Sequence, residues 1–583
     1  MKKRLLFVSL AACALGAMAQ GPSLTWTKLI DGPCGDTPNS LIESSDGKII
    51  AFCNFGSRTD DSPVYYDGVE VGKGCATTAN SDNCNALILK TDLDGTKLWS
   101  VYSNAGDLSL GSSSMAATAD GGAVVALKMR YASEYPDKYP LFVDASGSNW
   151  TIDTWNTGYR VYYIVILKID GSGDIEWMKK AEVDISPEEA ATTYSTGTPD
   201  AVDPYAVAVD DNNNIYIGGR YRKTMVFTNS TNGCVTLTPH NTEGWNGGSQ
   251  KVNGDMFLVK LDSNGNYLKH LTAKGINARD QITNLIYDNG KIYFAGNMQA
   301  AEANTPITIG KTATVTPTTL DDIFIGCADT TLNVSWATTI TAYGASDGTH
   351  ITQMKNMELV DGHLYVMGHV KGGFGPFGST EASIASTETP QEGFIIKCNA
   401  TDGTWVGGAT NGKSIGGYYG MVKDENSVFV FGYKLGTIFL DEYDETSWEK
   451  AREYDLITGG GLSTAWSSLH LGDNLYTFTR CNSAASSYYN SDVTTTSEGW
   501  GNIIACWNIA DLTSGTAQTA ANAETYIYGT EGGVKIVTAD TLKVKIYNTL
   551  GQEIYNGEAS TGSNFIALAQ GVYVVNDTKV IVR

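Results

Sequence analysis

The chain has 583 residues, and its 63 acidic residues outnumber its 40 Lys and Arg, which gives a formal net charge of −23. Such a charge repels nucleic-acid phosphates, so we expect no nucleic-acid partner. Gly (64 residues) and Tyr (31) are abundant and helical periodicity is scarce, a composition that suits strands and turns. We therefore expect an all-β protein.

Residues 1–19 predict a secretory signal peptide. A basic start, Lys2–Arg4, precedes an apolar stretch, and Ala17 and Ala19 supply the small residues of a cleavage site before Gln20. The alternative is a lipoprotein signal, because Leu-Ala-Ala precedes Cys13.

No later segment is apolar and long enough to span a bilayer, so we expect no transmembrane segment after the signal is removed. We then expect the chain to be exported, either to the outside or to the cell surface with attachment to the outer membrane.

Two short patterns recur along residues 20–509. The first is an apolar run that passes through an Asp/Asn/Gly turn and often closes on Trp, as in NALILKTDLDGTKLW at 85–99. The second is a tight hairpin of alternating Val, Ile, Tyr and Phe, as in AVAVDDNNNIYIGG at 206–219. The first pattern starts at residues 85, 163, 255, 322, 393, 437 and 502, and the second spans 40–52, 115–127, 206–219, 284–296, 356–368, 420–432 and 467–478.

This repetition predicts a seven-bladed β-propeller over residues 20–509, because each unit must bury its faces against its neighbours. The chain starts with the hairpin 40–52 and ends the array with the strand 502–509, so we expect these two pieces to close the ring together. The segment 24–29 is expected in the same closing blade. Six or eight blades are the alternatives to seven.

Long insertions follow several hairpins, at 54–84, 128–162, 220–253 and 297–320. The insertion 128–162 is rich in aromatic residues that break the repeat pattern, which favours a role in binding a glycan or a protein. The alternative is a loop that packs on itself. The candidate ligand-binding residues are Tyr131, Tyr135, Tyr139, Trp150, Trp155 and Tyr159.

Other repeated residues have structural interpretations. Tryptophans at equivalent positions are expected to pack blade against blade; they are Trp26, Trp99, Trp177, Trp336, Trp405 and Trp448. The acidic turns lack the spacing of a calcium loop, and no C-x-x-C zinc pattern exists, so we expect no metal and no cofactor.

Five of the ten cysteines have an interpretation, while Cys34, Cys53, Cys234 and Cys481 stay unassigned. Cys327, Cys398 and Cys506 replace Leu or Ile of other repeats and should be buried small hydrophobes. Cys75 and Cys84 lie in one polar loop and are the favoured disulfide pair.

A linker at 510–523 precedes a β-rich module at 524–583, where short strands predict a small Ig-like β-sandwich. Its hairpin VKIYNTLGQEIYNG turns at Gly551, and the strand from Gly571 through Tyr573 leads to a basic-apolar end at Lys579 and Arg583.

This module resembles the C-terminal sorting domains of Bacteroidetes type IX secretion, although it opens with Tyr-Ile-Tyr-Gly at 526–529 rather than Pro-Asn-Pro. The resemblance implies that the export machinery is a partner and that the protein is displayed at the cell surface. The alternative is an ordinary accessory domain. The repeats likewise resemble those of bacterial secreted β-propeller (SBBP) proteins, which implies the fold and surface interaction but no reaction.

The residues favour a noncatalytic surface protein that binds a glycan or a protein through its blade loops. The alternatives are a propeller-fold hydrolase or lyase acting on glycans, with carboxylates that converge in the central funnel, and a structural surface component. No nucleophile elbow or metal-binding helix motif is present, and the acidic run Asp441, Glu442 and Asp444 is interpreted as solvated surface, so no catalytic residue is assigned.

Overall fold

The computed structural model describes residues 22–582 in two compact units, Pro22–Thr513 and Ser514–Arg583, which we treat separately. The described range omits residues 58–60, 75–80, 105–113, 132–140, 152–160, 185–201, 229–232, 241–253, 275–276, 301–305, 318–321, 344–350, 376–383, 386–390, 413–416, 435, 459–463, 483–485, 489–490, 494–499, 514–524, 531, 539–540, 561 and 577.

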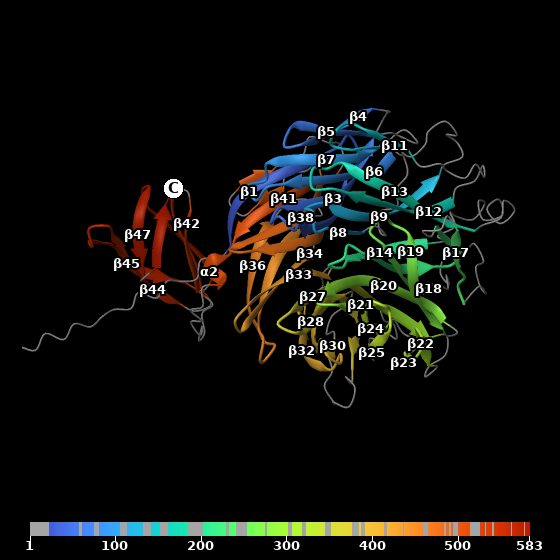
Figure 1. Cartoon of the computed structure of the whole chain (residues 1–583). Helices are drawn as coiled ribbons and strands as arrows, with labels where there is room; N and C mark the ends of the chain where they lie inside the picture. Colours follow the sequence, from blue (N-terminus) through green and yellow to red (C-terminus); the bar gives the residue numbers. More distant parts are fainter. Residues whose placement is uncertain are drawn as a thin grey trace, which may run out of the picture. The chain divides into compact units, whose positions relative to one another are not determined.

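The described part of the larger unit folds into seven antiparallel sheets of four or six strands, here called blades 1 to 7, plus a three-stranded extension (Figure 1). Blade 1 contains β2 (Thr37–Glu43), β3 (Ile49–Ser57), β6 (Ser81–Thr91), β7 (Lys97–Ser103), β10 (Leu141–Val143) and β11 (Asn149–Thr151). Blade 2 contains β8 (Ser114–Ala117), β9 (Ala123–Tyr131), β12 (Val161–Ile169), β13 (Ile175–Val183), β16 (Met225–Thr228) and β17 (Cys234–Leu237). Blade 3 contains β14 (Val202–Val209), β15 (Ile215–Tyr221), β18 (Asp255–Leu261), β19 (Tyr267–Lys274), β22 (Ile307–Ile309) and β23 (Ala313–Val315).

The remaining blades follow the same plan. Blade 4 contains β20 (Asn277–Asp288), β21 (Lys291–Ala300), β24 (Asp322–Asp329) and β25 (Val334–Ile340), followed by the extension β26 (Ala342–Tyr343), β29 (Gly373–Phe374) and β30 (Ile384–Ala385). Blade 5 contains β27 (Ile351–Val360), β28 (His363–Lys371), β31 (Glu392–Asn399) and β32 (Trp405–Thr410). Blade 6 contains β33 (Gly417–Asp424), β34 (Ser427–Lys434), β35 (Thr437–Asp444), β36 (Lys450–Thr458), β39 (Ser486–Tyr488) and β40 (Ser491–Val493). Blade 7 contains β37 (Thr464–Leu471), β38 (Asn474–Asn482), β41 (Trp500–Asn508), β1 (Ser23–Asp31), β4 (Ser62–Tyr66) and β5 (Val69–Gly74), and the short α2 (Ala510–Thr513) follows β41.

The blades form a ring. Their innermost strands contact one another in the cyclic order β2, β8, β14, β20, β27, β33 and β37, and β37 contacts β2 again. The apolar core lies between successive sheets: Ile50 and Phe52 of blade 1 share one buried cluster with Val125 and Leu127 of blade 2. The larger unit is therefore a β-propeller, as the sequence predicts.

Ring closure differs from the prediction in one respect. Strand β1 pairs with β41, with Leu29 opposite Ile503 and Ile30 opposite Asn502, so strands from both ends of the array do close the ring (Figure 1). The hairpin 40–52, however, is not in the closing blade, because β3 pairs with β6 and so belongs to blade 1. Each unit begins with the hairpin pattern and continues with the apolar run, which is the opposite grouping to the one predicted.

The insertions interlock the blades. Each hairpin inserted between the second and third strands of one blade crosses to the preceding blade and becomes its outer strands: β10–β11 joins β7, β16–β17 joins β13, and β4–β5 joins β1. Blade 6 has almost no insertion between β34 and β35, and the preceding blade 5 has only four strands in the described residues. The surplus length of the repeats thus builds the outer ring.

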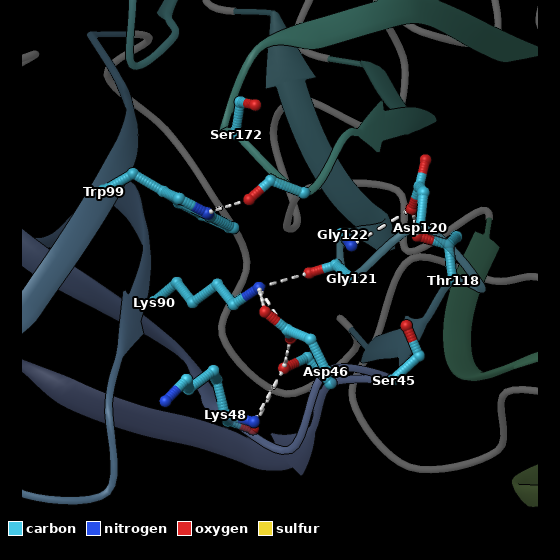
Figure 2. Close-up of polar contacts among 12 residues, drawn as sticks. Ser45, Asp46, Lys48, Lys90, Trp99, Thr118, Asp120, Gly121, Gly122 and Ser172 are labelled. Carbon is cyan, nitrogen blue, oxygen red and sulfur yellow. Dashed lines mark hydrogen bonds and ion pairs between the residues drawn. The ribbon is translucent and has the colours of Figure 1, made fainter.

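The repeated tryptophans also connect neighbouring blades. Trp99 Nε1 donates to the Gly171 carbonyl in the next blade (2.9 Å), as Figure 2 shows, and Trp177 Nε1 donates to the Ser263 carbonyl (3.0 Å). A Cβ on Gly173 would lie 2.7 Å from the Trp99 ring, so this position needs Gly for close approach as well as for its φ of +91°. Trp26 and Trp336 pack in the same way on Gly95 and Gly403, so the predicted packing between blades is confirmed for these four.

The Lys of the apolar run has a related role. Lys90 Nζ donates to Asp46 in its own blade (2.9 Å) and to the Gly121 carbonyl of the next blade (2.8 Å), as Figure 2 shows.

The carboxylates of the acidic turns accept hydrogen bonds from the backbone of their own turns. Asp92 Oδ1 accepts the N–H groups of Asp94 and Thr96. The interpretation of the acidic turns as turn chemistry is confirmed.

The smaller unit consists of two sheets. One contains β42 (Thr525–Thr530), β43 (Gly533–Thr538) and β46 (Gly562–Ala567), and the other contains β45 (Glu553–Ala559), β44 (Leu542–Asn548), β47 (Gly571–Val575) and β48 (Thr578–Val582). Val534 and Ile536 of the first sheet share a buried cluster with Val544 and Ile546 of the second, which makes this unit the predicted β-sandwich. Gly551 forms the β44–β45 turn with φ +76°.

Candidate functional site

The centre of the ring holds a cavity of about 600 Å³. Its lining comes from all seven innermost strands and includes Arg220 of β15 and Asn297 of β21. A cavity of this size suits a small molecule or a short stretch of polymer rather than a folded protein domain. The site is therefore built by every blade rather than by one insertion.

A β-bulge recurs at the same place in six of the described inner strands. Bulges re-aim a side chain, and here each extra residue lines the cavity. In two cases a Pro, which has no N–H to donate, immediately precedes the extra residue. The six extra residues, here called the bulge residues, are Asn39, Tyr205, Thr283, Lys355, Tyr419 and Trp466.

The bulge residues share a backbone geometry but differ in chemistry. An amide, a hydroxyl, an ammonium and three aromatic rings occupy equivalent positions, whereas positions that pack between blades keep apolar residues or Trp. A repeated position whose side chain differs from blade to blade is what an asymmetric ligand site requires. The side chains that line this cavity, here called the channel, thus vary from blade to blade, whereas the positions that pack between blades keep their class of residue.

Blade 3 fixes one wall of the channel by a buried ionic network. Asp203 accepts from Lys128 Nζ (2.6 Å) and from Arg220 Nη2 (2.6 Å), and Arg220 Nη2 also donates to Tyr205 Oη (3.2 Å). Burial raises the pKa of the Asp203 carboxyl, but Lys128 and Arg220 outweigh it and hold that pKa well below its usual range. Tyr205 is thus held on a rigid, charge-compensated support.

Blades 5 and 6 form the facing wall around Lys355. Its Nζ donates to Gln353 Oε1 (2.9 Å) and lies 5.8 Å from the centre of the Tyr419 ring. Glu358 Oε1 accepts from Asn356 Nδ2 and from the Met421 N–H, both at 3.1 Å. Lys355 forms no ion pair with any residue in the part of the chain that the structure describes.

Burial shifts both titratable groups of this wall towards neutrality. Desolvation lowers the pKa of Lys355 to about 8, and it raises the pKa of Glu358 to about 7 against the opposing Met421 N–H. Neither group compensates the other in an ion pair. The wall therefore carries an ammonium without a counter-charge.

Two amides on blade 4 have unused hydrogen-bonding capacity. Asn297 is 4% exposed and lines the cavity, and its Nδ2 has no partner among the described residues, while its Oδ1 accepts the Met354 N–H (3.4 Å). Gln281 Oε1 is also unpartnered within the described residues. Buried amides without partners are rare and are expected where a ligand completes the bonding.

Carboxylates do not converge in the channel as far as the structure describes it. None of the described residues that line the cavity is Asp or Glu. A glycosidase that uses two carboxylates needs both beside the scissile bond. The described lining therefore supplies binding groups rather than that catalytic pair.

The acidic run singled out in the sequence lies elsewhere. Asp441 is fully buried and pairs with Lys450 (3.0 Å), while Tyr418 Oη donates to its other oxygen. Burial raises its pKa to about 6 despite Lys450. The interpretation of this run as solvated surface is wrong for Asp441, because it is buried beside Tyr418, which belongs to the core between blades 5 and 6.

Of the aromatic residues predicted to bind ligand, the structure describes the side chain of Trp150. Trp150 lies on β11, is partly buried against the blade 1–blade 2 core, and donates from Nε1 to Asp144 (2.8 Å). Tyr131 ends β9, where its backbone pairs with Val161. Tyr135, Tyr139, Trp155 and Tyr159 lie outside the described residues, so ligand binding by this insertion stays a prediction.

The structure describes some of the other residues singled out in the sequence and not the rest. Cys327, Cys398 and Cys506 are at most 2% exposed, so their burial is confirmed. Cys75, the side chain of Cys84, the cleavage residues Ala17, Ala19 and Gln20, the side chain of Lys579 and Arg583 lie outside the described residues. Tyr573 packs against the sandwich core and its Oη donates to the Ala569 carbonyl (2.8 Å).

In the part of the chain that the structure describes, no group of three or more His, Cys, Asp or Glu could hold a metal ion. Nor does any helix in that part of the chain have the length and hydropathy to cross a bilayer.

No protein-family model and no curated protein matches the sequence. Solved structures with a similar chain include the quinohemoprotein alcohol dehydrogenase ADHIIG of Pseudomonas putida HK5 (12% identity, 86% of this chain and 78% of that one, TM-score 0.36). Others are the polysaccharide lyase Uly1 (9%, 82% and 90%, 0.34) and the Dos1 propeller (9%, 84% and 97%, 0.35). At such low identities and TM-scores, the function of this chain rests on its own residues.

Proposed function

We propose that this protein is an exported, noncatalytic surface protein whose propeller binds a glycan in the central channel. The observation that carries the proposal is the ring of bulge residues, because six equivalent backbone irregularities deliver six side chains to one cavity. Sugars present apolar C–H faces and many hydroxyls. The channel offers aromatic rings for the first, and amide and hydroxyl groups for the second.

The export part of the proposal has separate support. The basic start, apolar stretch and Ala-x-Ala site of residues 1–19 have the layout of a signal peptide, and residues 524–583 resemble type IX sorting domains. The β-sandwich forms a compact unit of its own, which suits a module that is read by export machinery. We propose that this module is the partner of that machinery and leads to display at the cell surface.

The binding proposal is tested by two Trp variants. Trp466 is a bulge residue, whereas Trp150 belongs to the outer edge of blade 1. We expect Trp466→Ala to weaken retention on immobilised bacterial and plant polysaccharides by about tenfold or more, and Trp150→Ala to leave it unchanged. Affinity electrophoresis of the folded variants measures both.

The opposite pattern would place the site on the insertion 128–162 and contradict the channel proposal. Release of reducing ends or unsaturated products from any retained polymer would contradict the noncatalytic part. Glu358→Gln is then the informative variant, because Glu358 is hydrogen-bonded to the channel residue Asn356.

A further inference from the structure

We infer that the glycan bound in the channel is anionic and that Lys355 binds its charged group. This inference rests on the proposed glycan-binding function and adds the chemical class of the ligand. Its basis is the charge of the channel wall, where Lys355 has no ion-pair partner among the described residues.

Lys355 differs from the other cations near the channel. Arg220 and Lys128 share the carboxylate of Asp203, so their charges are compensated. Lys355 has an amide and an aromatic ring as neighbours, and no carboxylate pairs with it among the described residues. Lys355 is half-buried, and an ammonium that is partly removed from bulk water is stabilised by an anion that pairs with it.

The acidic composition of the chain bears on the role of the Lys355 cation. Acidic residues exceed basic ones by 63 to 40, so the chain as a whole repels anions, and an anionic ligand needs a local cation whose charge is not already compensated. The nearest acidic residue along the strand, Glu358, is instead hydrogen-bonded to Asn356 and Met421. Glu358, which is not among the lining residues, thus has its own hydrogen bonds, and the Lys355 ammonium stays available.

A second group points to the same ligand chemistry. Asn297 Nδ2 is an unpartnered donor within the described residues, and its other amide atom accepts from Met354, the residue before Lys355. The backbone next to Lys355 on blade 5 is thus hydrogen-bonded to Asn297 on blade 4. Both residues line the same cavity, and two such donors match the oxygens of a carboxylate or a sulfate ester.

The test compares wild type, Lys355→Gln and Lys97→Gln on matched polymers. Lys97 is an exposed residue of β7, so its variant makes the same charge change away from the channel. The pairs are polygalacturonate with its methyl ester, and dextran sulfate with dextran. Uronate and sulfate are thereby distinguished as the source of the charge.

We expect wild type and Lys97→Gln to hold at least one charged polymer about tenfold more tightly than its neutral partner at 0.15 M salt. Lys355→Gln should lose that preference and retain its affinity for the neutral polymer. The inference is overturned if no charged polymer is preferred by wild type, or if the preference survives in Lys355→Gln.

Failure of this inference is distinct from failure of the proposed function. If Trp466→Ala abolishes binding while Lys355→Gln changes nothing, the channel binds glycans but does not select their charge. If Trp466→Ala has no effect, the channel is not the binding site.

Discussion

At the residue scale, the channel depends on side chains whose partners come from other strands. Lys128, Asp203 and Arg220 stand on β9, β14 and β15, and only folding brings them together. The sequence contains no local pattern that pairs them. Their network is the support of Tyr205, which makes it a good place to test how the channel is held.

Replacement of Asp203 tests this support. Asp203→Asn leaves Lys128 and Arg220 without their counter-charge, so we expect the free energy of unfolding to fall by about 3 kcal/mol or more. The control is Asp67→Asn, because Asp67 pairs with Lys28 on the surface (51% exposed) and its loss should cost less than about 1 kcal/mol. Urea denaturation measures both.

The same variant has a defined pH dependence. The folded-state pKa of Asp203 is depressed below its unfolded value, so its contribution is complete at neutral pH and is lost as pH falls below about 4. The stability difference between wild type and Asp203→Asn should therefore shrink on acidification. A difference that grows below pH 4 would contradict the ionic account.

The bulge residues show why the candidate site was missed in the sequence. Asn39, Lys355 and Trp466 are of different residue types, and nothing in their immediate neighbourhoods marks a site. Alignment of the hairpin repeats does show one position just before each hairpin where residue type is not preserved. That weak signal becomes meaningful only once the bulge aims each side chain at the ring axis.

At the element scale, the insertions explain why the repeats are long. The hairpin β10–β11 is inserted in blade 2 but pairs with β7 of blade 1, and Phe142 of β10 is fully buried there. An insertion that covers the outer edge of the preceding blade removes an exposed sheet edge. The repeat length is thus a structural device, and a binding loop is not needed to account for it.

A substitution in this hairpin tests the interlock. Phe142→Ala should cost about 3 kcal/mol or more because the side chain is buried between two blades. Thr151→Ala, at the exposed end of the same hairpin, should change stability by less than about 0.5 kcal/mol. We expect limited proteolysis to cut Phe142→Ala faster near residues 141–151. Equal stability of the two variants would show that the hairpin does not hold the blades together.

At the scale of the whole molecule, the two units should be separable. A chain that ends at Thr513 retains all seven blades in the described residues, including the β1–β41 pairing that closes the ring. We expect it to unfold at the same temperature as the propeller of the full chain and to bind the same polymers. It should fail to reach the cell surface, because the module 524–583 is missing.

Cell fractionation with surface proteolysis measures this outcome, and calorimetry provides the control for folding. Surface display at the wild-type level by the folded, shortened chain would contradict the sorting role. A large drop in the unfolding temperature would instead show that the propeller depends on the module.

The sequence by itself determined the all-β class, the propeller, the separate C-terminal sandwich, the packing role of four of the six repeated Trp residues and the turn role of the repeated Asp residues. These features are local or periodic, because hairpin turns, strand alternation and repeat spacing are written in neighbouring residues. The tertiary structure decided which strands close the ring, where the insertions pair, and which side chains meet in the channel. Those depend on hydrogen bonds between blades and on bulges, where one extra residue reverses the direction of a side chain and no short-range pattern reports it.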